Sequence, residues 1–87
     1  MNIRDGLNKV IKDGMTYHKI MNEPINLLDD DWIRIYKGKS SMVNDLIFSC
    51  DYKDTDKIPK EILDMKYDTQ ANWFVGGNLS VDFIIEE

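Results

Sequence analysis

The feature that most constrains the fold is a strict alternation of side-chain character over residues 79–86. One set of alternate positions is apolar and consists of Leu79, Val81, Phe83 and Ile85. The other set is mostly polar and consists of Ser80, Asp82, Ile84 and Glu86. A period of two is typical of a β-strand that turns one face toward a core. We therefore expect the chain to close with a strand.

Three further segments carry β-strand signals. Residues 32–36, Trp-Ile-Arg-Ile-Tyr, alternate in the same way, and residues 37–40 follow as a turn. Residues 43–50 then predict the second arm of a hairpin, in which Leu46, Phe48 and Cys50 face inward. Residues 15–20 predict an earlier strand, which ends at the breaker Asn22-Glu23-Pro24.

The beginning of the chain has helical periodicity instead. Its apolar positions follow the spacing of one helical face: Ile3, Leu7, Val10 and Ile11. We expect a helix over residues 3–13, with Asn2 as its amino-terminal cap and Gly14 in the left-handed position after its last turn. Gly6 weakens the interior of such a helix by about 1 kcal/mol relative to alanine. Its presence indicates either compensating packing or a close approach to the backbone.

These segments together predict the fold class. Residues 51–60 are polar and predict a loop, after which Pro59 can start either a helical turn or a short strand over residues 61–67. We expect an α+β fold in which one amino-terminal helix packs on an antiparallel sheet of four or five strands. A chain of 87 residues is long enough for a single domain, residues 1–87.

Charge and composition exclude several classes of function. The chain has 11 basic and 16 acidic side chains, a net charge of −5, and the excess of acid falls after residue 20. Non-specific nucleic-acid binding needs a basic field, so we expect no direct nucleic-acid partner. The apolar runs are too short for a membrane span, and residues 1–5 do not resemble a leader. The single cysteine, Cys50, favours a reducing compartment.

No catalytic or metal-binding constellation stands out. Catalysis by a cysteine-histidine dyad would depend on His18 and Cys50, which we interpret as structural residues of two strands. The acidic stretches 29–31 and 51–56 lack the glycine and the spacing of a calcium loop. We therefore expect a protein that is not an enzyme and that holds no metal and no cofactor.

Two groups of residues are candidates for ligand binding. Trp32, Arg34 and Tyr36 project from one strand face, where two aromatic rings can stack a base and a guanidinium can meet a phosphate. The second group, Asn72, Trp73 and Asn78, surrounds a pair of glycines whose backbone amides can approach a ligand. Aromatic residues that fill a core, and a Gly-Gly turn between two strands, are the structural alternatives.

The order of these features resembles a family of phage anti-defence proteins, the second Thoeris anti-defence type, which are small sponges for cyclic nucleotide signals. The resemblance rests on residues 10–14 (Val-Ile-Lys-Asp-Gly), His18-Lys19, residues 32–50, Asp64-Met65-Lys66, Trp73 and Asp82-Phe83. It implies a homo-oligomer in the cytoplasm of the host bacterial cell. It also implies that the protein binds cyclic ADP-ribose-like or cyclic oligonucleotide messengers without catalysis.

Two functions from different classes remain as hypotheses. The first is the sponge, in which the six candidate residues, Trp32, Arg34, Tyr36, Asn72, Trp73 and Asn78, hold a cyclic nucleotide. The second is an acidic inhibitor, similar to an anti-CRISPR or immunity-type protein. In that case Asp29 to Asp31 and the carboxylates of residues 51–56 oppose a basic groove of a host protein.

Overall fold

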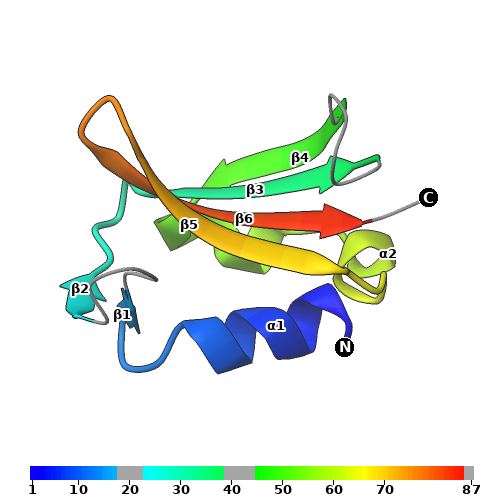
Figure 1. The fold of residues 1–87 in the computed structure, drawn as a ribbon. Helices are drawn as coiled ribbons and strands as arrows, with labels where there is room; N and C mark the ends of the chain where they lie inside the picture. The colour runs from blue at the N-terminus through cyan, green and yellow to red at the C-terminus, as the bar shows by residue number, and fades with distance from the viewer. Residues whose placement is uncertain (18–22, 39–44, 86–87) are drawn as a thin grey trace.

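A four-stranded sheet forms one layer of the molecule, and the helix α1 (Ile3–Val10) lies beneath it (Figure 1). The structure is a computed structural model and describes residues 1–17, 23–38 and 45–85. The strand order is β4-β3-β6-β5, and the strands are β3 (Trp32–Lys37), β4 (Asp45–Asp51), β5 (Thr69–Val75) and β6 (Asn78–Ile85). A separate sheet consists of β1 (Met15–Tyr17) and β2 (Pro24–Asn26). The expected α+β fold is confirmed.

The main sheet is mixed, whereas the sequence predicted only antiparallel pairs. The hairpins β3-β4 and β5-β6 are antiparallel, but the two central strands β3 and β6 run parallel, with Trp32 opposite Ser80 and Tyr36 opposite Ile84. The chain reaches the far edge through a 3-10 helix, η1 (Tyr52–Lys57), and a short helix, α2 (Lys60–Leu63). This crossover joins the two edge strands, so the strands that meet in the middle are the first and the last of the sheet.

The core fills the space between the sheet and α1. Ile33 and Ile35 of β3 and Val81 and Phe83 of β6 are fully buried there, as is Ile3 of the helix. The alternation over residues 79–85 is therefore confirmed, with the apolar set facing the core. Burial of apolar surface of this kind is the main favourable contribution to folding.

The helix has the expected cap and a shorter length. The Asn2 carboxamide accepts a hydrogen bond from the Asp5 amide at 2.8 Å, as a capping side chain does. A β-carbon built on Gly6 would lie 2.4 Å from Tyr67 Cε1 and 2.8 Å from Phe83 Cε1. Gly6 therefore marks the close approach that its sequence position suggested, because no larger residue fits between α1 and β6.

The helix ends at Val10 because a tight turn follows it. Lys12 and Met15 exchange two backbone hydrogen bonds of 2.9 Å, and the two residues between them, Asp13 and Gly14, have φ angles of 54° and 72°. Two positive φ angles are typical of a type I′ turn, for which Asp-Gly is a preferred sequence. Gly14 does adopt the expected left-handed conformation, but it reverses the chain into β1 rather than capping a helix through residue 13.

The register of β4 differs from the sequence prediction at one residue. A bulge shifts the ladder between Ile35 and Tyr36, so Phe48 lies opposite Ile35 and Leu46 lies opposite Tyr36. Cys50 and Phe48 contact the core as predicted, but the inward placement of Leu46 was wrong, since its side chain is 52% exposed. An inserted residue in one strand moves everything beyond it to the other face.

Several segments differ from the predicted elements. Most of residues 51–60, predicted as a loop, lies in η1, and residues 61–67 contain the rest of α2 and a bridge between Lys66 and Asn2. Strands β2 and β5 were not assigned from the sequence, although a Gly-Gly turn between strands was one interpretation of residues 76–77 and is what joins β5 to β6. The predicted positions 18–20, 39–40, 43–44 and 86 lie outside the described residues. No helix in the described part of the chain is long and apolar enough to cross a membrane.

Candidate functional site

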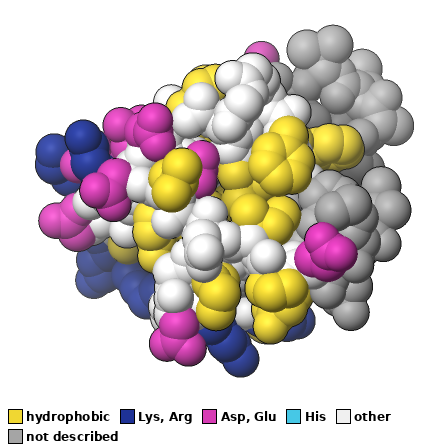
Figure 2. Space-filling model, turned by 90° about the vertical axis from the view of Figure 1, so that its left-hand side faces the viewer, with side chains coloured by type: hydrophobic (Ala, Val, Ile, Leu, Met, Phe, Trp, Pro, Cys, Tyr) yellow, Lys and Arg dark blue, Asp and Glu magenta, His cyan; other side chains and the backbone are white. Residues whose placement is uncertain are grey.

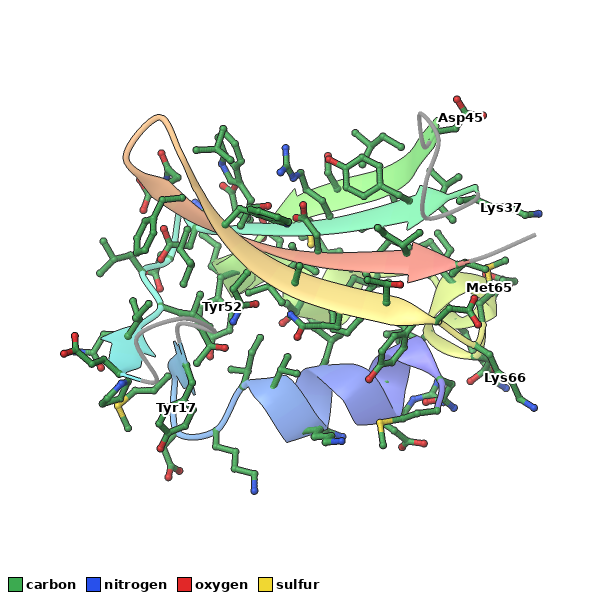
Figure 3. All side chains as sticks on the ribbon, viewed as in Figure 1. Tyr17, Lys37, Asp45, Tyr52, Met65 and Lys66 are labelled. Carbon is green, nitrogen blue, oxygen red and sulfur yellow. The ribbon has the colours of Figure 1, made fainter. Side chains whose placement is uncertain are left out.

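The candidate site is the face of the main sheet that points away from α1, here called the outer face. No described element covers it, and side chains stand freely above the strands in Figure 3. The outer face carries the alternate residues of β3 that do not enter the core, namely Trp32, Arg34 and Tyr36. The alternation of the sequence is therefore what brings these three predicted residues together.

Arg34 occupies the middle of the outer face and is paired with Asp82 of the neighbouring strand. Its Nε donates to Asp82 Oδ1 at 3.1 Å and its Nη2 donates to Asp82 Oδ2 at 3.0 Å, which is a bidentate ion pair. The Ser80 hydroxyl donates to Asp82 Oδ1 at 2.5 Å. The hydrogen bond to Asp82 raises the pKa of Arg34, even though partial burial opposes the charge. The guanidinium thus stays charged at any physiological pH.

The same guanidinium lies between two aromatic rings. Arg34 Cζ is 5.6 Å from the ring centroid of Trp32 and 5.6 Å from that of Tyr36, within the range of a cation–π contact. The three side chains therefore hold one another in place. Of the guanidinium nitrogens, Nε and Nη2 donate to Asp82, and Nη1 is left without a bond to that carboxylate.

Trp73 belongs to the same outer face. It lies opposite Ser80 on one side of β6, while Trp32 lies opposite Ser80 on the other side. Ser80 is fully buried although it is an outer-face residue, and Trp73 remains 57% exposed. Two strand spacings separate the tryptophans, or about 10 Å at the backbone. The outer face therefore carries two indoles on either side of a small residue.

The two asparagines of the predicted site are both committed to other parts of the chain, Asn72 on the inner side of the sheet and Asn78 at the turn end of the outer face. Asn72 precedes Trp73 and so points to the opposite side of β5, where its Nδ2 donates to Thr16 Oγ1 at 3.0 Å and to the Tyr17 carbonyl at 2.9 Å. Asn78 donates from Nδ2 to the Asp30 carbonyl at 2.9 Å. Both side chains link separate parts of the fold. The structure brings together four of the six predicted residues, places Asn72 on the other side of the sheet and commits the Asn78 amide to the turn before β3.

The sequence interpretation missed four polar residues of the outer face. Ser80 and Asp82 face outward in the alternation of β6, but only the parallel pairing of β3 with β6 brings them beside Trp32 and Arg34. Ser49 and Asp51 of β4 lie opposite Arg34 and Trp32. Asp51 and Ser49 line a hollow of about 360 Å³ together with Trp32, Arg34 and Cys50. Finding these four residues from the sequence would have required knowing which strands pair and in which register.

The environment of Cys50 lowers the reactivity of its thiol. Partial burial, with the nearby carboxylates of Asp54, Asp51 and Asp56, raises the pKa of the thiol to about 11. The thiol is therefore protonated at neutral pH and is a poor nucleophile. His18, the other residue considered for catalysis, lies outside the described residues. Among the described residues, no group of three His, Cys, Asp or Glu side chains is placed to hold a metal ion.

The two acidic stretches lie side by side. The amide of Tyr52 donates to the Asp31 carbonyl at 2.6 Å, and the amide of Lys53 donates to the Asp29 carbonyl at 3.1 Å. Asp31 itself is buried, and its carboxylate accepts from the amides of Leu28 at 2.7 Å and Leu79 at 3.0 Å. Asp29 and Asp30 are therefore solvent-exposed, whereas Asp31 fastens the turn to β6.

Exposed apolar side chains gather at the end of the molecule that carries the β5-β6 turn, as Figure 2 shows. This end includes Trp73, Phe74 and Leu28, which are 57%, 59% and 62% exposed.

Comparisons of the chain with protein-family models, with curated proteins and with solved structures give no match. An assignment of function to this chain therefore depends on the geometry of the outer face.

Proposed function

We propose that the chain is a non-catalytic binding protein that sequesters a nucleotide by stacking its base on the outer face. The observation that carries this proposal is the arrangement around Arg34, which Asp82 and the rings of Trp32 and Tyr36 hold in one position on an uncovered sheet face. A fixed aromatic and guanidinium surface stacks flat rings at little cost in side-chain entropy. Trp73 adds a second indole on the same face.

The proposed ligand is a cyclic nucleotide messenger, either cyclic ADP-ribose-like or a cyclic oligonucleotide. In this proposal the protein works as a sponge in the cytoplasm of a host bacterial cell, as a homo-oligomer, and lowers the free concentration of the messenger without a cofactor. The ion pair with Asp82 balances the charge of Arg34, so the guanidinium attracts a phosphate only weakly. Base stacking is therefore the larger part of the proposed recognition.

Thermal unfolding with a ligand panel tests this proposal. The panel contains cyclic ADP-ribose isomers and cyclic di- and trinucleotides, and the protein is first shown by absorbance and mass spectrometry to be free of bound ligand. A ligand at about a thousand times its dissociation constant adds about 4 kcal/mol, which raises the midpoint of a domain this small by more than about ten degrees. No shift with any member of the panel would exclude the sponge for these messengers.

Two variants locate the binding on the outer face. Trp73→Leu removes the exposed indole at that face and is expected to reduce the ligand-induced shift. Tyr17→Leu is a matched control because Tyr17 is a similarly exposed aromatic residue, 56% accessible, on β1 of the small sheet. Each shift is measured against the midpoint of the same variant without ligand. Equal losses in both variants would contradict a site on the outer face.

The second candidate is an acidic inhibitor that occludes a basic groove of a host protein. It is favoured by the backbone hydrogen bonds that join residues 29–31 to residues 52–53 and so combine two acidic stretches in one surface. Binding of this kind weakens steeply with salt, because a Debye length is only about 8 Å at physiological ionic strength. Neutralising Asp29 and Asp30 would weaken the inhibitor and leave a nucleotide sponge unchanged.

A further inference from the structure

The hollow between β3 and β4 on the outer face contains the Asp51 carboxylate, which has no hydrogen-bond or ion-pair partner among the described residues and lies beside the indole of Trp32. Trp32 lies directly opposite Asp51 in the ladder, and Arg34 lies opposite Ser49. Side chains of such cross-strand pairs have β-carbons about 4.5–5.5 Å apart and point to the same side. Four side chains therefore converge on the hollow of about 360 Å³ that they line.

Asp51 supplies acceptors to this hollow and no donor. It occupies the cap position of η1, but its side chain makes no capping hydrogen bond with that helix. An ionised carboxylate presents two oxygens that accept side by side. Arg34, the cation of the hollow, already has Asp82 as its partner. A group that enters beside Trp32 therefore meets an aromatic face and a pair of acceptors.

The chemistry of the base edges decides which base fits. The Watson–Crick edge of guanine carries two adjacent donors, N1–H and N2–H, which match the two oxygens of a carboxylate. Adenine and cytosine each place an acceptor nitrogen next to their amino group, and uracil flanks its single N–H with two carbonyl oxygens. Those lone pairs repel a carboxylate, so guanine is the one common base that Asp51 can hold through two hydrogen bonds.

We propose that the outer face selects guanine, with the base stacked on Trp32 and its Watson–Crick edge on the Asp51 carboxylate. This inference rests on the proposed function and names the ligand class of the same site. The carboxylates of Asp51 and Asp56 act on the neighbouring Cys50, Asp54 is paired with Lys57 at 3.2 Å, and the cation Arg34 is already paired with Asp82. The phosphate of the ligand therefore points away from the hollow. The protein recognises the base, so a neutral nucleoside should be enough for binding.

Nucleoside binding, followed by calorimetry, tests the proposal with guanosine, inosine and adenosine as probes. Guanosine is expected to bind about ten- to a hundredfold more tightly than adenosine, the discrimination typical of a bidentate base contact. Inosine lacks the N2 amino group and is expected to fall between them. GMP is expected to bind within about threefold of guanosine, because the carboxylates of the region oppose a phosphate.

Asp51→Asn keeps the shape of the side chain and replaces one acceptor by a donor that opposes guanine N1–H. It is expected to remove most of the preference for guanosine over adenosine. Asp45→Asn is the matched control, since Asp45 is an exposed residue at the other end of β4 and the change in charge is the same. The midpoint of unfolding of each variant shows whether it is folded.

The outcomes separate this inference from the function on which it rests. Equal affinity for guanosine and adenosine, unchanged by Asp51→Asn, would overturn guanine selection and leave the sponge intact. Binding of cyclic nucleotides without binding of any nucleoside would also overturn it, because recognition would then depend on phosphate. Failure of every nucleoside and every cyclic nucleotide would overturn both.

Discussion

Arg34 and Asp82 show how a charged pair can be kept on the face of a small sheet. Their side chains are 22% and 8% exposed, so both are largely removed from water by the residues around them. The aromatic rings of Trp32 and Tyr36 flank the guanidinium, and Ser80 donates to the carboxylate. Each of these contacts offsets part of the cost of desolvating two charges.

Removing one member of this pair is therefore expected to destabilise the fold more than removing both. Arg34→Met leaves the buried Asp82 carboxylate without its cation and should lower the free energy of unfolding by about 3 kcal/mol. The double variant Arg34→Met with Asp82→Leu should recover most of that loss, because no uncompensated charge remains. Urea unfolding of the two variants measures the difference. Equal losses would mean that the pair contributes mainly through packing.

The environment of Cys50 predicts that its thiol reacts slowly with alkylating reagents. Its pKa is raised from 9.0 to about 11 by burial and by the carboxylates of Asp54, Asp51 and Asp56, so the reactive thiolate at pH 8 is roughly a hundredfold rarer than in an unfolded chain. Alkylation by iodoacetamide should be correspondingly slow in buffer and fast in urea. The folded pKa lies above the unfolded one, so this residue favours folding below about pH 9 and loses that contribution between pH 9 and 11. Equal alkylation rates in both states would contradict the structure.

At the scale of the elements, α1 depends on a single glycine for its position under the sheet. Tyr67 and Phe83, which meet edge to face with centroids 4.8 Å apart, approach the helix backbone at Gly6. The lack of a side chain at Gly6 lets the helix lie against both rings. The cost in helix propensity, about 1 kcal/mol, is offset by this packing.

Gly6→Ala is therefore expected to destabilise the protein although alanine favours a helix. Its β-carbon would overlap Tyr67 and Phe83, and overpacking of this kind costs about 1–3 kcal/mol. Asn8→Ala, at an exposed position of the same helix, is the control and should be neutral or slightly stabilising. Denaturant midpoints of the two variants give the comparison. A gain in stability from Gly6→Ala would show that the helix is not so close to β6.

Local patterns of the sequence predicted most of these elements. The alternation in β3 and β6 and the periodicity of α1 depend only on neighbours in the chain. The sequence alone was therefore enough to predict which side of each element faces the core. The bulge before Phe48, the parallel pairing of β3 with β6 and the neighbours of Arg34 depend on residues far apart in sequence. For the same reason the sequence predicted Trp32, Arg34 and Tyr36 as one group but missed Asp82. Asn72 and Asn78 carried no local sign of the backbone carbonyls that they bind.

At the scale of the whole molecule, a few long-range contacts join the layers and the small sheet. Ile3 of α1 shares the core with Phe83 of β6, and the Ile3 amide donates to the Met65 carbonyl at 2.9 Å. Asn72 fastens β1 to β5, and the Asp31 carboxylate fastens the turn after β2 to the amide of Leu79. These contacts cross between elements in every case. The helix and the sheet therefore depend on each other for stability.

The last prediction is that residues 1–87 unfold in one cooperative transition. The fluorescence of Trp32 and Trp73 reports on the sheet, and far-ultraviolet circular dichroism includes the signal of α1, so the two urea curves should coincide. The slope should be about 1 kcal/mol per molar urea for a chain of this size. Ile3→Ala, which opens a cavity between helix and sheet at a cost of about 2–5 kcal/mol, should move both curves together. Loss of the helix signal at lower urea than the tryptophan signal would show that α1 folds onto a sheet that is stable without it.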